Sequence, residues 1–132
     1  MREPSFLGLD EILALHADQI RRYGGRAGAR DLELLRSALA TPEATYAGDY
    51  LHTDLFEMAA AYLFHIIRNH PFVDGNKRTG LMAALAFLGL NGLELQAEPD
   101  SLVAVVMGVA AGEVGKAEVA VFLQEHSRPR GA

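Results

Sequence analysis

The sequence predicts an all-α protein, a compact single-domain bundle of about six helices with two buried helices at its centre. The chain has 132 residues, which is the usual size of one domain. Half of the residues are hydrophobic and 22% are charged, a balance typical of a packed globular domain. Apolar residues recur at helical spacing between capping residues, glycines and prolines. We expect one helical domain over residues 1–126 and a frayed tail over residues 127–132.

The first third of the chain predicts two outer helices and a loop. A helix of about four turns is expected after Asp10, which would cap it, and it ends at Gly24-Gly25. Asp31 opens a shorter helix that stops before Pro42. Residues 46–52 show no convincing period, so we expect a loop there.

Two central helices are predicted next, because apolar residues occupy most sides of each segment. One runs from Thr53-Asp54 to about Asn69, and the other runs from about Asn76 to Asn91-Gly92. A helix that is apolar nearly all round must be covered by other elements. We therefore expect these two helices to pack together in the core.

The last part of the chain predicts two more helices. Asp100 would cap a valine-rich stretch that extends to Ala111. Its β-branched residues would also suit a buried strand, but the length and the cap favour a helix. Gly115-Lys116 leads into the final helix.

Composition excludes several classes of protein. The chain has no cysteine, so it forms no disulfide framework and no thiolate zinc site, and we expect a cytoplasmic protein. Its 12 basic and 17 acidic side chains give a net charge of −5, which argues against direct nucleic-acid binding. Apolar runs such as residues 80–90 are well short of the roughly 20 residues that span a bilayer, so no membrane partner is expected.

The segment between the central helices, residues 70–80, is where chemistry is expected. Pro71 disfavours the α conformation at His70, so we expect the helix to end there and His70 to be extended. Phe72 is apolar within a polar loop and is expected to reach the core. Asp74-Gly75 forms a turn in which Gly75 is free to adopt a positive φ.

Asn76, Lys77 and Arg78 fall in the first turn of the following helix. Two cations at the positive end of a helix dipole are unfavourable by about 0.3–1 kcal/mol each, which suggests that they serve a bound anion. Free backbone N–H groups and both cations would converge on a phosphate. Asp74 is placed to hold Mg²⁺, and a neutral His70 can accept a proton from a hydroxyl. The segment therefore indicates phosphoryl or nucleotidyl transfer.

Other charged and metal-binding patterns are weaker. The histidines lack zinc-peptidase spacing, Gly115-Lys116 lacks the rest of a P-loop, and protein-kinase motifs are absent. Arg68 either reaches the loop or ends its helix in solvent. The basic cluster has two readings, a helix C-terminus with solvated neighbours or a docking patch; its members are Arg21, Arg22, Arg26 and Arg30.

The loop resembles the signature of the Fic/Doc family, specifically its death-on-curing (Doc) toxin branch. That signature reads histidine, any residue, phenylalanine, any residue, acid, alanine or glycine, asparagine, lysine, arginine. The chain matches every defined position with His70, Phe72, Asp74, Gly75, Asn76, Lys77 and Arg78. Flanking similarity includes residues 13–16 with Tyr23-Gly24-Gly25, residues 53–57, and Asn91-Gly92.

The resemblance implies a Fic fold and transfer from a nucleoside triphosphate to a protein hydroxyl. By position, His70 is the base, Asp74 carries Mg²⁺, and Arg78 stabilises the transition state. Gly75, Asn76, Lys77 and Arg78 would contact ATP, with Asn76 either holding phosphate or orienting the loop. AMP-transferring relatives have glycine where this chain has Lys77; lysine there is typical of Doc-type kinases.

The resemblance also implies partners. The target would be elongation factor Tu, whose phosphorylation arrests translation, and the restraint would be a separate Phd-like antitoxin. We find no internal inhibitory helix, since Thr53 and Glu57 are followed by Met58 in a core helix. Two alternatives stay open at this stage: a Fic-type AMP or nucleotidyl transferase, and a catalytically silent binding module partnered with an antitoxin.

Overall fold

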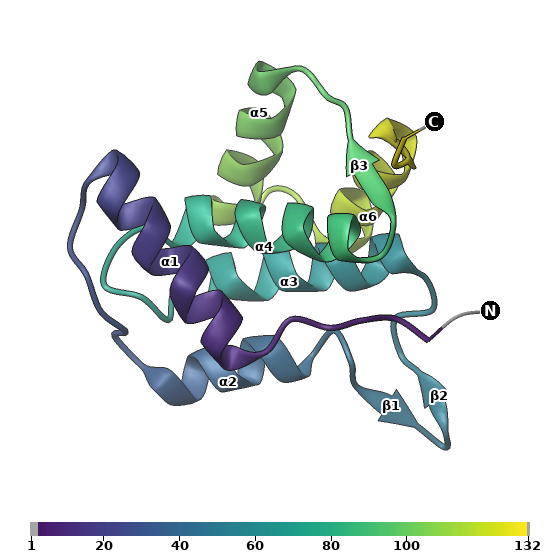
Figure 1. The fold of residues 1–132 in the computed structure, drawn as a ribbon, viewed down its shortest axis with the longest axis horizontal. Coiled ribbons are helices and arrows are strands. Elements are labelled where there is room, and N and C mark those ends of the chain that lie inside the picture. Colours follow the sequence, from purple (N-terminus) through teal and green to yellow (C-terminus); the bar gives the residue numbers. More distant parts are fainter. Residues whose placement is uncertain (1–2, 132) are drawn as a thin grey trace.

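The computed structural model describes residues 3–131 and shows a helical fold with four short strands (Figure 1). This confirms the predicted all-α class with about six helices. The elements, in chain order, are α1 (Leu9–Tyr23), α2 (Leu32–Ala40), β1 (Thr45–Tyr46), β2 (Asp49–Tyr50), α3 (Leu55–Asn69), α4 (Asn76–Leu90), β3 (Leu93–Leu95), α5 (Pro99–Ala110), α6 (Lys116–His126) and β4 (Ser127–Pro129).

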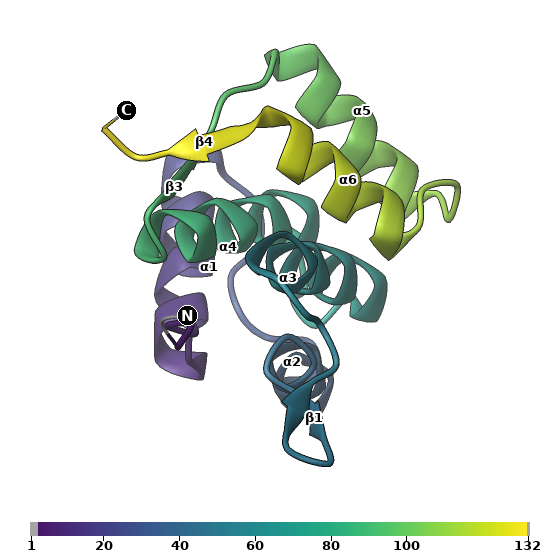
Figure 2. The same cartoon turned by 90° about the vertical axis from the view of Figure 1, so that its right-hand side faces the viewer.

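Helices α3 and α4 lie side by side through the middle of the molecule, as predicted (Figures 1 and 2). The other helices surround them: α2 and α6 pack on α3, and α1 packs on α4. The largest fully buried side chains include Tyr62 and Leu63 of α3 and Phe87 and Leu88 of α4. The central pair therefore forms the core and fixes the loop that joins it.

Two of the four residues predicted to cap the start of a helix do so in the structure. Asp31 accepts the Leu34 N–H at 3.1 Å, and Asp54 accepts the Glu57 N–H at 2.8 Å. The prediction of Asp10 as the first cap is wrong. Helix α1 begins earlier, after Gly8, because the Glu11 carboxylate accepts the Gly8 N–H at 2.8 Å.

The prediction that Asp100 caps the fifth helix is also wrong. Helix α5 begins at Pro99, whose fixed φ suits the first helical position, and Glu98 precedes it as the cap. Asp100 instead lies in the first turn, where a carboxylate still complements the helix dipole.

Residues 46–52 are not wholly a loop, because β1 and β2 form a small antiparallel hairpin there. Ala47 and Gly48 connect the strands with positive φ values of 52° and 87°, as tight hairpin turns require. Strands of two residues are too short to show a period of two in the sequence. The hairpin could not be recognised from periodicity for that reason.

The expectation of a frayed tail over residues 127–132 is wrong for Ser127–Pro129, which form β4 and pair with β3. An Arg128–Glu94 ion pair at 3.2 Å and a hydrogen bond from the Arg130 N–H to the Gly92 carbonyl at 2.8 Å reinforce the pairing. These partners are far apart in sequence, so no local pattern indicates them. Within residues 3–131, no helix combines the length and the apolar character needed to cross a membrane.

Candidate active site at the start of helix α4

The loop between the central helices lies at one end of the α3–α4 pair, beside the C-terminal end of α1 (Figure 1). It begins at His70, whose φ of 53° and ψ of 51° are left-handed and not extended as predicted. The His70 N–H still bonds to the Ile66 carbonyl at 3.2 Å, so His70 closes the last turn of α3. Pro71 disfavours the right-handed α conformation at the residue before it, His70. The left-handed conformation of His70 avoids that clash and turns the chain sharply.

Phe72 and Asn76 hold the loop against the core, and both are buried. The Asn76 side-chain oxygen accepts the Phe72 N–H at 2.9 Å, and its amide nitrogen donates to the Phe72 carbonyl at 3.0 Å. Both polar ends of this side chain are therefore engaged with the backbone. Of the two roles left open by the sequence, the structure shows the Asn76 side chain orienting the loop.

His16 also contacts the loop, and the sequence reasoning missed it. Its ring lies flat against Phe72, with centroids 3.8 Å apart and planes inclined by 5°. Its Nε2 atom lies 2.8 Å from the Asp74 carbonyl oxygen. The available signal was its position one turn after Ile12 on the buried face of α1.

The segment between α1 and α2 runs alongside the loop and is bonded to it. The Val73 N–H donates to the Gly28 carbonyl at 3.1 Å, and the Arg30 N–H donates to the Pro71 carbonyl at 2.6 Å. The Arg30 guanidinium also donates to the carbonyls of His70 and Asn69, at 2.8 and 3.2 Å. Arg30 thus covers the C-terminal end of α3 and fixes the point where the loop begins.

The N-terminus of α4 presents unpaired donors. The first bond within the helix runs from the Thr79 N–H to the Gly75 carbonyl at 2.9 Å, and Gly75 has a φ of 78°. Within residues 3–131, the N–H groups of Asn76, Lys77 and Arg78 have no acceptor, and the first turn contains no acid. Three free N–H groups, a helix dipole and two cations form an electrostatic site for an anion.

A cavity of about 410 Å³ opens on one side of this helix end. His70 and Lys77 line it together with buried Asn76. Arg68 lines it too, but its guanidinium donates to the carbonyls of Val109 and Ala110 at 3.3 and 3.4 Å. Arg68 therefore covers the C-terminal end of α5 and joins that helix to the cavity wall.

Asp74 and Arg78 lie toward α1 and do not line that cavity. The Asp74 carboxylate accepts the N–H groups of Gly75 and Arg26, at 2.8 and 3.3 Å, and these bonds lower the pKa of Asp74. The Arg78 guanidinium donates to the Gly24 carbonyl at 3.0 Å and lies 5.3 Å from the centre of the Tyr23 ring. The predicted residues thus fall on two sides of the same helix end.

The side chains at this helix end supply only part of the ligands that a bound metal ion would need. Among residues 3–131, no three histidine, cysteine, aspartate or glutamate side chains converge as a metal site. Asp74 alone offers an exposed, ionised carboxylate with lone pairs to spare. A single carboxylate suits Mg²⁺, which takes its other ligands from water and phosphate.

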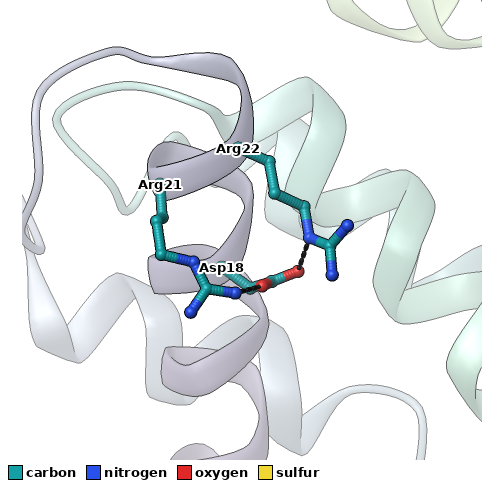
Figure 3. Close-up of polar contacts among 3 residues, drawn as sticks. All are labelled: Asp18, Arg21 and Arg22. Carbon is teal, nitrogen blue, oxygen red and sulfur yellow. Dashed lines mark hydrogen bonds and ion pairs between the residues drawn. The ribbon is translucent and has the colours of Figure 1, made fainter.

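The basic cluster does not converge on the loop as one patch. Arg21 and Arg22 both bind the Asp18 carboxylate on the outer side of α1 (Figure 3). Both arginines are well exposed, so these pairs contribute little to stability. The Arg30 side chain donates to the His70 carbonyl at the start of the loop, and the Arg26 backbone N–H donates to the Asp74 carboxylate.

A larger cavity, about 650 Å³, lies between the N-terminal segment, the β1–β2 hairpin and the end of α4. It contains none of the predicted site residues. The smaller cavity beside His70 and Lys77 is the better candidate, because it combines a titratable base with a concentration of positive charge.

Comparisons with known proteins show which family the chain resembles. Residues 6–88, which include the whole loop, match the family described as the Fic/DOC family. The chain is 40% identical over 115 residues to a protein of Escherichia phage P1 named "Protein kinase doc", covering 87% of this chain and 90% of that relative. It is 46% identical over 78 residues to a Mycolicibacterium smegmatis protein named "Toxin Doc", covering 59% of this chain and 60% of that relative.

Proposed function

The chain belongs to the Fic/DOC family, and from that membership we propose that it is a toxin kinase of the Doc type, a phosphotransferase acting on a protein hydroxyl. The names of its two relatives, a protein kinase and a toxin, support the same activity here. ATP is proposed as the phosphate donor, with the γ-phosphate facing His70. The observation that carries the proposal is the shared cavity of His70 and Lys77 beside the free N–H groups of α4.

His70 is proposed as the general base. Its side chain is exposed, and no group within residues 3–131 hydrogen-bonds to its ring, which leaves the imidazole free to meet an incoming hydroxyl. Arg30 and the left-handed backbone fix where the ring emerges. Proton acceptance by a positioned histidine accelerates such a transfer by about 10²–10⁴-fold.

The end of α4 is proposed as the phosphate cradle. The N–H groups of Asn76, Lys77 and Arg78 and the Gly75 turn would face the phosphate oxygens, since they form the positive end of the helix. Lys77 stands on the His70 side of this end and Arg78 on the α1 side. Phosphates lying across the helix end would therefore meet both cations, with Arg78 placed to stabilise the charge of the transition state.

Asp74 is proposed as the protein ligand of Mg²⁺. Its carboxylate is already held in its ionised form by two backbone N–H groups, so no proton need be lost to bind a cation. The cation, when bound, supplies positive charge to the phosphate oxygens. The backbone N–H groups of Gly75 and Arg26 orient the carboxylate, and the side chains of Lys77 and Arg78 would provide the remaining positive charge.

Partners and compartment follow from the resemblance and stay proposals. We propose elongation factor Tu as the target, with arrest of translation in the cytoplasm as the outcome. A Phd-like antitoxin is proposed as the restraint. An AMP transfer and a catalytically silent module are the competing activities, and one experiment separates all three.

The experiment incubates the purified chain and its His70→Ala variant with elongation factor Tu, Mg²⁺ and ATP labelled at either the α or the γ phosphorus. We expect label from γ-labelled ATP only, and a loss of about 10²-fold or more in the variant. Label from α-labelled ATP would replace the kinase with an AMP transferase. Growth of cells that express either protein is measured in parallel, and growth arrest by both proteins without any label would favour the silent module.

His70→Ala is a suitable control because the His70 side chain is exposed and its backbone makes the contacts that hold the loop. Circular dichroism of the two proteins should therefore agree. Mass spectrometry of the target distinguishes an added phosphate from an added AMP directly.

A further inference from the structure

Resting on the proposed function, we propose that His16 is a positioning residue: it fixes the Asp74 peptide and the start of α4, and thereby sets the geometry of the phosphate and cation site. His16 lies on α1, away from the signature loop in sequence, and it does not line the cavity formed by His70 and Lys77. Its effect on the reaction would act through Asp74 and Gly75.

The contacts of His16 are directed at the middle of the loop. Its side chain is 4% exposed, although histidine is a polar residue on a helix whose outer face is solvated. Its Nε2 atom is 2.8 Å from the Asp74 carbonyl, and its ring is stacked on Phe72. A carbonyl oxygen only accepts, so Nε2 carries the proton in the tautomer that this bond requires.

Two buried side chains therefore hold the loop at two successive points. Asn76 holds the Phe72 peptide from within α4, and His16 holds the Asp74 carbonyl from α1. Without the second contact, the peptide that joins Asp74 to Gly75 would be held only by the bond from the Gly75 N–H to the Asp74 carboxylate, and it would rotate more easily about the Gly75 turn. Rotation there would move both the carboxylate and the first N–H groups of α4.

His16 also lies beside Gly75. A Cβ built on Gly75 would lie 3.3 Å from Ile20 Cδ1 and 3.6 Å from the His16 Nε2 atom, so two side chains of α1 border this turn. The glycine has a φ of 78°, a conformation that a side chain would strain. The left-handed turn and the imidazole beside it form one packed unit at the N-terminus of α4.

A histidine that only filled the core would be replaceable by another flat ring. Phenylalanine in its place would keep the stacking on Phe72 but remove the donor to Asp74. Glutamine would lose the ring but can place an amide N–H near the position of Nε2. The pair His16→Phe and His16→Gln therefore separates ring packing from hydrogen-bond donation.

The experiment uses the full chain and measures four quantities for each variant: kcat and KM for Mg·ATP in phosphate transfer to elongation factor Tu, the Kd of Mg·ATP by calorimetry, and hydrogen exchange of the loop amides. We expect His16→Phe to lower kcat/KM by about 10- to 100-fold, as loss of an outer partner of a metal ligand does. We expect faster exchange at Val73 and Asp31, whose N–H groups bond across the loop. His16→Gln should restore kcat/KM to within about threefold of the wild type.

Unchanged kcat/KM and unchanged loop exchange in His16→Phe would overturn the inference, since ring packing alone would then suffice. Failure of the proposed function looks different: the wild type would transfer no phosphate, while the Kd of Mg·ATP and the loop exchange would still respond to His16→Phe. If His16→Phe does not fold, His16→Asn replaces it, because its shorter amide cannot reach Asp74. Equal behaviour of His16→Asn and His16→Gln would then overturn the inference.

Discussion

Asn76 shows how one side chain can hold the backbone of the candidate site. Its two hydrogen bonds to Phe72, at 2.9 and 3.0 Å, are buried and satisfy both backbone polar groups of that residue. Removal of the amide would leave a buried N–H and a buried C=O without partners. The penalty for such groups is larger than the gain from an average hydrogen bond.

We therefore expect Asn76→Ala to lower the free energy of unfolding by about 1–3 kcal/mol and to weaken Mg·ATP binding. Urea denaturation and calorimetry measure the two effects. Asn69→Ala is the matched control, since Asn69 donates one bond to the Leu34 carbonyl at 3.0 Å and does not hold the loop. An equal loss of Mg·ATP affinity in both variants would contradict the role given to Asn76.

At the residue scale, the sequence predicts which residues form the loop better than it predicts their backbone conformations. The motif placed His70, Phe72 and Asn76 correctly in a loop and first turn, and Gly75 has the positive φ expected of it. The left-handed conformation of His70 was not foreseen, because the pattern excluded a helix without choosing among the other conformations. His16 was missed because its partner lies far along the chain and no local spacing indicates that contact.

At the scale of elements, the close approach of α3 and α4 holds the site rigid, and Gly80 makes that approach possible. A Cβ on Gly80 would lie 2.9 Å from Ile67 Cγ1 and 3.1 Å from the Leu63 carbonyl oxygen. Ile67 is buried, and the carbonyl belongs to the backbone of a central helix, so neither can move freely. The loop and the N-terminus of α4 are only a turn away.

We expect Gly80→Ala to destabilise the protein by about 1–3 kcal/mol, because overpacking outweighs the improved helix propensity of alanine. Gly89→Ala in the same helix provides the control. A Cβ on Gly89 would lie 3.7 Å from the flexible end of Arg130, so the better helix propensity of alanine should stabilise this variant by up to about 1 kcal/mol. Urea midpoints that move in the same direction for both variants would contradict this account of the interface.

The elements that the sequence predicts are those whose signals are local. Helices α3 and α4 carry apolar residues on most sides, and Asp54 caps the start of α3. The bounds predicted for these two helices therefore agree with those in the structure. The strand pairing of Leu93–Leu95 with Ser127–Pro129 depends on contacts between distant segments. The β1–β2 hairpin has strands too short for alternation to appear.

At the scale of the whole molecule, a polar cluster on the far side of α3 ties three segments together. The Lys116 ammonium at the start of α6 lies 3.0 Å from His52 Nε2 and 3.1 Å from His65 Nε2. His52 precedes α3 and His65 lies within it, so the cluster fastens α6 to the core. Both imidazoles must be neutral to accept these bonds, since a protonated nitrogen has no lone pair to offer.

Burial and the neighbouring Lys116 charge lower the pKa of both histidines, and that of His65 falls to about 4. Between the unfolded value near 6.5 and these lower values, the unfolded chain binds more protons than the folded chain. The stability conferred by the neutral histidines is therefore complete above about pH 6.5 and is lost as the pH falls toward 4. Each proton can contribute at most about 1.4 kcal/mol per pH unit, and solvent screening at these half-buried groups reduces that slope.

His65→Gln tests this account, because glutamine can still accept a bond from Lys116 but does not titrate. We expect urea unfolding of the wild type to show falling stability from pH 6.5 to pH 4.5, and the variant to show a visibly shallower fall over the same range. The pKa of Asp74 is lowered by its backbone hydrogen bonds, and the pKa of Asp18 is lowered by its hydrogen bond from Arg22. Both carboxylates therefore titrate below this pH range and do not affect the comparison of the two slopes. Identical slopes for the two proteins would mean that the acid sensitivity arises elsewhere, and that Lys116 and its histidines do not fasten α6 through neutral imidazoles.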